Sequence, residues 1–460
     1  MAGQSARSFG ACKWLLITMT LLLSVFSLIQ CRHVSNFPVH EVVGVRLQEE
    51  PLIGLRIDLV RTDSPLSPFS PGNISSTERF KRAIKRSQDR LEKLQMSVDE
   101  VKAVEAPVYA GNGEFLMKMA IGTPSLSFSA ILDTGSDLTW TQCKPCTDCY
   151  PQPTPIYDPS QSSTYSKVPC SSSMCQALPM YSCSGANCEY LYSYGDQSST
   201  QGILSYESFT LTSQSLPHIA FGCGQENEGG GFSQGGGLVG FGRGPLSLIS
   251  QLGQSLGNKF SYCLVSITDS PSKTSPLFIG KTASLNAKTV SSTPLVQSRS
   301  RPTFYYLSLE GISVGGQLLD IADGTFDLQL DGTGGVIIDS GTTVTYLEQS
   351  GYDVVKKAVI SSINLPQVDG SNIGLDLCFE PQSGSSTSHF PTITFHFEGA
   401  DFNLPKENYI YTDSSGIACL AMLPSNGMSI FGNIQQQNYQ ILYDNERNVL
   451  SFAPTVCDTL

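Results

Sequence analysis

Two short segments of this sequence carry the same pattern of residues that could do chemistry. Each has two apolar residues, an aspartate, a small hydroxyl residue, a glycine and a second hydroxyl residue; they are residues 131–136 (ILDTGS) and 337–342 (IIDSGT). Each copy predicts a buried strand that runs into a tight turn, with the aspartate where the strand ends. The glycine lets the backbone approach the carboxylate, and the hydroxyls can donate hydrogen bonds to it.

One such copy could be an ordinary turn, because aspartate before Thr-Gly or Ser-Gly is common turn chemistry. Two copies are harder to explain in that way. Asp133 and Asp339 lie 206 residues apart. We therefore expect two similar lobes that each contribute one carboxylate to a shared cleft.

The composition indicates the elements that must position these residues. The chain has 460 residues, enough for two or three domains, with 40% apolar and 15% charged residues, 42 Gly and 26 Pro. Residues 114–122 (EFLMKMAIG) and 128–136 (FSAILDTGS) read as strands, and residues 304–319 and 391–405 alternate and break at glycine as β-hairpins do. Short strands should therefore dominate a globular, turn-rich fold.

An apolar run at residues 14–29 follows Arg7 and Lys13 near the start of the chain. A signal anchor or membrane span is one interpretation. The run of about 16 residues is short for a span, so we favour a cleaved secretory signal over about residues 1–31.

Twelve cysteines lie beyond the expected signal segment 1–31, an even number that predicts six disulfides in a secreted chain. Zinc is the alternative for Cys143, Cys146 and Cys149. Only three histidines lie beyond residue 40, and none is close in sequence to that cluster; they are His218, His389 and His396. We therefore expect no metal site.

The charge balance changes along the chain. Residues 32–105 carry 12 Lys/Arg against 11 Asp/Glu, whereas residues 106–460 carry 14 against 29. The cations gather in residues 78–94 (ERFKRAIKRSQDRLEKL), which have a helical period. A nucleic-acid patch or a solvated helix would be alternatives. We favour a removable pro-segment whose cations cover an acidic cleft until acid protonates the carboxylates.

Two further patterns resemble catalytic motifs. Residues 311–315 (GISVG) match the G-x-S-x-G pattern of serine hydrolases, but Ser313 lies between β-like segments rather than before a helix, and no histidine partner is apparent. The glycine clusters at 229–231 and 235–237 could cradle a phosphate, yet no nucleotide fingerprint is completed. Neither pattern is expected to be functional.

The two aspartate motifs resemble the active-site signatures of pepsin-like aspartic proteases. Trp140 follows Asp133 by seven residues, and Tyr194-Gly195-Asp196 stands where that family has its flap tyrosine. Residues 238–240 (LVG) and 430–432 (IFG) are similar to the apolar-apolar-Gly segments of each lobe. The cysteine-rich insert after residues 141–149 (TQCKPCTDC), residues 221–228 (FGCGQENE) and the ending resemble the nepenthesin type of plant enzyme.

This resemblance implies an all-β, bilobal fold with a central peptide-binding cleft. It divides the chain into a signal at 1–31, a basic pro-segment at 32–106, an N-terminal lobe at 107–297 and a C-terminal lobe at 298–460. It implies a flap made of Tyr194, Gly195 and Asp196 and braced by Trp140. The implied disulfides are Cys143–Cys146, Cys149–Cys223, Cys170–Cys188, Cys175–Cys183, Cys263–Cys457 and Cys378–Cys419.

The resemblance also implies roles for the two motifs. Asp133 and Asp339 would share one proton and activate a water molecule that attacks the scissile carbonyl, without a metal, a cofactor or a covalent adduct. Gly135, Ser136, Gly341 and Thr342 would orient the carboxylates, and Thr134 and Ser340 would tie the two loops together. Asn73, in the pro-segment, is the one N-x-S/T sequon and hence the glycosylation candidate.

The sequence thus predicts a secreted, monomeric acid endopeptidase made as a zymogen. Its partners would be protein or peptide substrates and pepstatin-type inhibitors. We expect no binding to nucleic acid, and no stable association with a membrane once the signal has been removed. The compartment would be extracellular or apoplastic, with the vacuole as the alternative. One competing hypothesis is a non-catalytic binding protein of the same fold that inhibits cell-wall-degrading glycosidases. A glycosidase using the same carboxylates is weaker, since the chain has only Trp14 and Trp140 to build a sugar cleft.

Overall fold

The computed structural model describes residues 54–94, 114–194, 198–229, 232, 234–380 and 390–460. All of them belong to one compact unit that spans Glu50–Leu460. The expected signal segment lies outside the described residues. Among the helices in the described ranges, none is long and apolar enough to cross a membrane.

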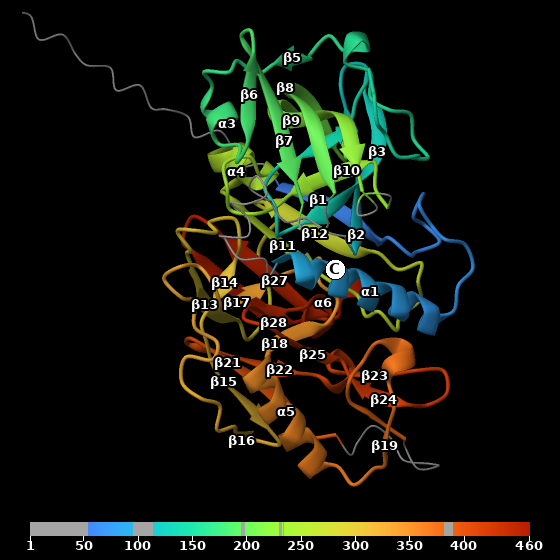
Figure 1. The fold of residues 1–460 in the computed structure, drawn as a ribbon, viewed down its shortest axis with the longest axis vertical. Coiled ribbons are helices and arrows are strands. Elements are labelled where there is room, and N and C mark those ends of the chain that lie inside the picture. The colour runs from blue at the N-terminus through green and yellow to red at the C-terminus, as the bar shows by residue number, and fades with distance from the viewer. Residues whose placement is uncertain (1–53, 95–113, 195–197, 230–231, 233, 381–389) are drawn as a thin grey trace, which may run out of the picture. The chain divides into compact units, whose positions relative to one another are not determined.

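Strands dominate the fold and form two lobes, one green and one orange to red in Figure 1. The strands expected at 114–122 and 128–136 are confirmed, and the second ends at Asp133 itself. The N-terminal lobe is built from one sheet with the strands β2 (Phe115–Ile121), β3 (Leu126–Asp133), β4 (Trp140–Gln142), β5 (Ser166–Lys167), β6 (Tyr181–Ser184), β7 (Asn187–Ser193), β8 (Ser199–Leu211), β9 (Gln214–Glu228) and β10 (Gly237–Gly240).

The C-terminal lobe repeats this plan and adds two four-stranded sheets. The hairpins expected at 304–319 and 391–405 are confirmed as the pairs β15–β16 and β21–β22. The strands are β14 (Tyr306–Leu307), β15 (Leu309–Val314), β16 (Gln317–Leu318), β17 (Val336–Ile338), β18 (Thr345–Glu348), β19 (Gln367–Val368), β20 (Cys378–Phe379), β21 (Ile393–Phe397), β22 (Ala400–Leu404), β23 (Ile410–Thr412), β24 (Ala418–Leu420), β25 (Met422–Ser425) and β26 (Ser429–Phe431).

A further set of strands joins the lobes. Pairing runs from β1 through β12, β11, β27 and β28 to β13, so that strands from both ends of the chain share one sheet. These strands are β1 (Gly54–Arg61), β11 (Lys259–Cys263), β12 (Ser275–Gly280), β13 (Ser291–Val296), β27 (Tyr439–Asp444) and β28 (Val449–Pro454). One apolar core runs beneath them, because leucines and aromatic residues of β1, β11, β27 and β28 all belong to it.

The basic segment expected to be helical forms α1 (Ser76–Leu94), which confirms that prediction. The Ser75 hydroxyl accepts a hydrogen bond from the Glu78 amide and begins the helix as a capping residue does. Phe80, Ala83 and Ile84 are buried on one face, and the Phe80 ring stacks on Tyr411 with 3.5 Å between the centroids. The other helices are α3 (Ser173–Gln176), α4 (Leu248–Leu252), α5 (Gln349–Ser362) and α6 (Asn433–Gln436).

The described part of the chain contains six disulfides, but four of the implied pairs are wrong. The bonds that match the family scheme are Cys263–Cys457 and Cys378–Cys419. The others are Cys143–Cys223, Cys146–Cys149, Cys170–Cys183 and Cys175–Cys188, in place of Cys143–Cys146, Cys149–Cys223, Cys170–Cys188 and Cys175–Cys183.

Local pairing explains each correction. Strand β4 runs parallel to β9 with Thr141 opposite Cys223, and the Cys143 amide bonds to the Gly224 carbonyl, so Cys143 meets Cys223. Cys146 and Cys149 then close their own short loop. In the insert, the two buried cysteines, Cys175 and Cys188, bond within one apolar cluster, whereas Cys170 and Cys183 bond nearer the surface.

Candidate active site

Each aspartate ends a strand that is held on one side by a parallel neighbour. Strand β10 pairs with β3 so that Gly240 stands opposite Asp133, and β26 pairs with β17 so that Phe431 stands opposite Ile338. The Phe241 amide then donates to the Asp133 carbonyl, and the Asp339 amide donates to the Phe431 carbonyl. The two apolar-apolar-Gly segments therefore fix where each carboxylate leaves the sheet.

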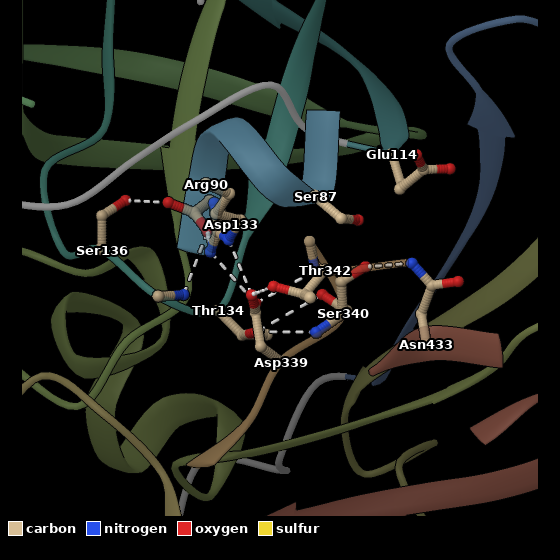
Figure 2. Close-up of polar contacts among 12 residues, drawn as sticks. Ser87, Arg90, Glu114, Asp133, Thr134, Ser136, Asp339, Ser340, Thr342 and Asn433 are labelled. Atoms are coloured by element: carbon tan, nitrogen blue, oxygen red, sulfur yellow. Dashed lines mark hydrogen bonds and ion pairs between the residues drawn. The ribbon is translucent and has the colours of Figure 1, made fainter. Parts of the chain in front are cut away.

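The two carboxylates have matching hydrogen-bond donors (Figure 2). On the first, the Gly135 amide lies 3.0 Å from Oδ1 and the Ser136 hydroxyl 2.5 Å from Oδ2 of Asp133. On the second, the Gly341 amide lies 3.0 Å from Oδ1 and the Thr342 hydroxyl 2.6 Å from Oδ2 of Asp339. Donors on both oxygens hold each carboxylate in a fixed orientation.

The two loops are also bonded to each other. Thr134 Oγ1 donates to Asp339 Oδ1 at 3.1 Å and accepts from the Ser340 amide at 3.2 Å. Asn433 then donates from Nδ2 to the Ser340 carbonyl at 3.0 Å. The structure thus brings both aspartates and their six flanking residues into one buried cluster, as Figure 2 shows.

A residue that was not singled out in the sequence fills this cluster. Nη2 of Arg90, on α1, lies 2.6 Å from Asp133 Oδ1 and 3.0 Å from Asp339 Oδ1, and Nε lies 2.7 Å from Asp339 Oδ2. Arg90 is only 1% exposed. Burial alone would lower the pKa of Arg90, but the charges of Asp133 and Asp339 raise it above its ordinary value. Burial would likewise raise the pKa of Asp339, yet Arg90 and Thr342 hold it below the usual range.

The helical period carried a signal for Arg90. Arg86 and Arg90 are four residues apart and recur on the buried side of α1, beside Ala83, Ser87 and Leu91. Cations that recur within an apolar stripe must meet buried counter-charges, because unpaired burial of a charge is costly. This spacing could have identified both arginines.

A second buried network surrounds Arg86. Its Nη2 lies 2.8 Å from Asp63 Oδ2 and 2.8 Å from Glu114 Oε1, and Glu114 also pairs with Arg61 at 3.4 Å. Thr343, two residues beyond Gly341, donates to Glu114 and to the Ala83 carbonyl. Burial would raise the pKa of Glu114, but the charges of Arg86 and Arg61 lower it.

The expected flap lies partly outside the described residues, because Gly195 and Asp196 are not among them. Tyr194 follows β7 and is buried in a cluster with Trp140 and Phe232. Its ring centroid lies 4.8 Å from that of Phe232, which in turn lies 4.7 Å from that of Trp140. Burial raises the pKa of Tyr194, while the Trp140 side chain opposes the shift.

The other candidate patterns differ in outcome. Ser313 does have a histidine partner, contrary to expectation: its hydroxyl lies 2.7 Å from His396 Nε2, and His396 Nδ1 lies 2.7 Å from Asp401. These residues lie across β15, β21 and β22, whose backbone amides are engaged in the sheet ladders instead of forming an oxyanion hole.

In the ranges that the structure describes, no group of three or more His, Cys, Asp or Glu could hold a metal. Asn73 is exposed before α1.

Comparison with known proteins gives a consistent family. Two family models match, described as "Xylanase inhibitor N-terminal" over residues 115–281 and "Xylanase inhibitor C-terminal" over residues 304–454. Aspartic proteinase nepenthesin-2 of Nepenthes gracilis is 49% identical over 412 residues, covering 89% of this chain and 92% of that protein. Aspartic proteinase nepenthesin-1 of the same plant is 48% identical, covering 91% and 95%.

Solved structures agree on the fold alone, because their sequence identity is low. The crystal structure of edgp has a TM-score of 0.63 at 20% identity and covers 77% of this chain and 94% of that one. Basic 7S globulin from soybean has a TM-score of 0.57 at 19% identity, with 74% and 93% covered. With relatives named as proteinases at nearly half identity over most of its length, the chain belongs to the pepsin-like aspartic proteases, within their nepenthesin-type plant branch.

Proposed function

We propose that the chain is the precursor of a secreted acid endopeptidase whose active site is blocked by its own Arg90. The observation that carries the proposal is the single guanidinium bonded to both aspartates. A substrate carbonyl and a water molecule would need the positions that Arg90 fills. Residues 32–106 would therefore have to be removed to release the enzyme, with lobes at 107–297 and 298–460.

Acid would provide the trigger. The pKa of Asp339 and that of Glu114 are both lowered by arginines of the pro-segment, against the effect of burial. These carboxylates lose their attraction for Arg90, Arg86 and Arg61 once they are protonated at low pH. Exposed pairs contribute only about 0–1 kcal/mol each, whereas these buried pairs keep their strength because water screens them little.

Once Arg90 leaves, the two carboxylates face each other without a cation. At about 4 Å and an effective dielectric near 20, two like charges repel by roughly 4 kcal/mol. One proton is then shared, as is well known for this family. The ionised carboxylate takes a proton from a water between Asp133 and Asp339, and the protonated one hydrogen-bonds the scissile carbonyl. As the water attacks, the protonated carboxyl gives its proton to the carbonyl oxygen, which forms a neutral gem-diol that the same two groups stabilise. When the C–N bond then breaks, the proton taken from the water passes to the leaving amine, and a proton returns from the gem-diol to the pair of aspartates.

The surrounding residues keep this geometry. Donors from Gly135, Ser136, Gly341 and Thr342 set the plane of each carboxylate, and the Thr134–Ser340 contact keeps the two loops in register. Tyr194, braced by Trp140, would close over the substrate and exclude water. No cofactor enters any of these steps.

Secretion is supported by the apolar run at 14–29 and by six disulfides, which persist in oxidising compartments. The enzyme would act on protein or peptide substrates as a monomer, be inhibited by pepstatin-type compounds, and work in the extracellular space, the apoplast or the vacuole. The net charge of −12 suits work in acid, where protonation moderates it.

The test is proteolysis of a denatured protein after acid treatment, with and without pepstatin. Asp133→Asn and Asp339→Asn should each lower kcat by about 10²–10⁴-fold or more, and Asp320→Asn, an exposed control, should not. Activity that survives pepstatin and both active-site substitutions would exclude the mechanism. Absence of proteolysis at every pH after removal of the pro-segment would favour the glycosidase-binding alternative, which the description of the family models raises.

A further inference from the structure

Asp137, four residues after Asp133, connects the loop of the first aspartate to two other segments. Its carboxyl Oδ1 accepts a hydrogen bond from the Gly244 amide at 2.8 Å, and Oδ2 accepts one from the Thr303 hydroxyl at 2.7 Å. Gly244 belongs to the N-terminal lobe, whereas Thr303 lies three residues before β14 of the C-terminal lobe. One side chain therefore bonds to both lobes.

The glycines of residues 240–244 (GFGRG) are explained by this carboxyl. A Cβ at Gly240 would collide with the backbone of Asp137, and a Cβ at Gly242 or Gly244 would collide with its carboxylate oxygens. The segment thus wraps around Asp137 at distances that only glycine permits. It is not shaped as an empty cradle for a phosphate.

The same segment also bonds to the catalytic loop. The Phe241 amide donates to the Asp133 carbonyl at 2.7 Å, and the Gly242 amide donates to the Ser136 carbonyl at 2.8 Å. Next to Gly244, the Arg243 amide donates to the Thr303 carbonyl at 3.0 Å. The backbone that carries Asp133 is therefore held to the far lobe through residues 240–244 and Asp137.

We propose that Asp137 is a positioning residue that fixes Asp133 relative to Asp339 by clasping the two lobes through Gly244 and Thr303. The proposal rests on the proposed function, since it concerns the geometry of that dyad. In this role Asp137 acts through the backbone of the Asp133 loop and makes no direct contact with Arg90 or with the substrate. Its loss should change how fast bound substrate reacts more than how tightly substrate binds.

The surroundings favour the neutral form of this carboxyl. Withdrawal from water raises the pKa of Asp137 to about 6, against the hydrogen bonds from Thr303 and Gly244, and the charge of Asp133 adds to the rise. Tyr192 and Tyr305 also face it, while the Arg243 side chain turns away to Val296 and Asn448. At acid pH the protonated carboxyl can accept from Gly244 and donate to Thr303, which keeps both contacts.

Three substitutions separate this role from a merely structural one. Asp137→Ala removes both contacts and should lower kcat of the activated enzyme by about tenfold or more while KM changes less than about twofold. Asp137→Asn copies the protonated carboxyl, so it should recover most of that kcat and shift the alkaline limb of the pH profile upward from about 6. Thr303→Val, a second variant if Asp137→Ala fails to fold, should lower kcat with the same small effect on KM.

A measurement that does not depend on catalysis tests the contacts of Asp137 with Gly244 and Thr303 even if the proposed function fails. Because the folded pKa of Asp137 is raised, the stabilisation it gives is complete below its ordinary value of 3.8 and is lost as pH rises through about 6. The melting temperature of an Asp339→Asn precursor, which cannot cleave itself, should fall over that interval, and adding Asp137→Asn should remove the fall while adding the exposed Asp320→Asn leaves it. The positioning role of Asp137 would be overturned if Asp137→Ala or Thr303→Val kept the kcat of the wild type. It would also be overturned if the wild type and Asp137→Asn had identical pH profiles.

Discussion

Arg90 and Asp339 form a two-point ion pair across 249 residues of sequence, with Nε 2.7 Å from Oδ2 and Nη2 3.0 Å from Oδ1. Such a paired geometry is the strongest that an arginine makes with a carboxylate. Here the same Nη2 also bonds to Asp133. In the proposed precursor, a cation therefore occupies the place between the two carboxylates where the mature enzyme would hold a shared proton.

Replacing Arg90 by alanine should weaken the precursor most at neutral pH. Two buried carboxylates would remain without a cation, and loss of one partner of a buried pair typically costs about 3–5 kcal/mol. Urea unfolding near pH 7 measures this loss. The pH at which half of the precursor has lost its pro-segment should also rise by about one unit or more.

Arg82→Ala is the matched control for that experiment. Arg82 lies on the exposed side of α1, and among the described residues its ion-pair partner is Glu78, four residues before it. Its loss should change stability by less than about 0.5 kcal/mol. Equal effects of the two substitutions would mean that Arg90 does not hold the dyad in solution.

Glu114→Gln tests the second buried network. Since the folded pKa of Glu114 is lowered, its stabilisation is present above its ordinary value of 4.5 and lost as pH falls through the lower folded value. Glutamine imitates the protonated acid, so the substitution should cost about 3 kcal/mol at neutral pH and progressively less in acid. Unfolding of an Asp133→Asn precursor, which cannot cleave itself, allows the comparison across pH.

The control for this network is Glu398→Gln on the exposed surface. It should leave the pH dependence unchanged. A penalty for Glu114→Gln that stays constant from neutral to acid pH would contradict an electrostatic role for the network.

Phe80 should anchor the N-terminal part of α1. Its ring is fully buried and stacked on Tyr411 of the C-terminal lobe, so Phe80→Ala should cost about 3–5 kcal/mol of docking. Amide exchange of α1 should accelerate about a hundredfold at neutral pH. Phe80→Leu, which keeps most of the volume, should have a much smaller effect, and equal exchange in both variants would contradict the anchor.

The sequence predicted those parts of the fold that depend on local pattern. The duplicated motif placed Asp133 and Asp339 at strand ends, since apolar runs and a following glycine specify a strand and its turn wherever they occur. The alternation at 391–405 likewise specified β21 and β22. In each case the neighbours in sequence are also the neighbours that decide the structure.

Long-range partners could not be read in this way. The contact between Arg90 and Asp133 joins residues that are 43 positions apart in the sequence. The contact between Ser313 and His396 joins residues that are 83 positions apart. The disulfides of the insert depend on how residues 170–176 pack against the hairpin that holds Cys183 and Cys188, which stand opposite each other. Only the folded arrangement decides whether Cys170 bonds to Cys183 and Cys175 to Cys188, or the reverse.

The revised disulfides give a last prediction. By chain entropy, Cys143–Cys223 closes a separation of 80 residues and should contribute about 4–5 kcal/mol, whereas Cys146–Cys149 closes a separation of 3 and should contribute about 1.6 kcal/mol. The double variant Cys143→Ala/Cys223→Ala should therefore lower stability much more than Cys146→Ala/Cys149→Ala. Under the family pairing each of these variants would break the same two bonds, so equal losses, or a Cys149–Cys223 linked peptide in a non-reducing digest, would restore that pairing.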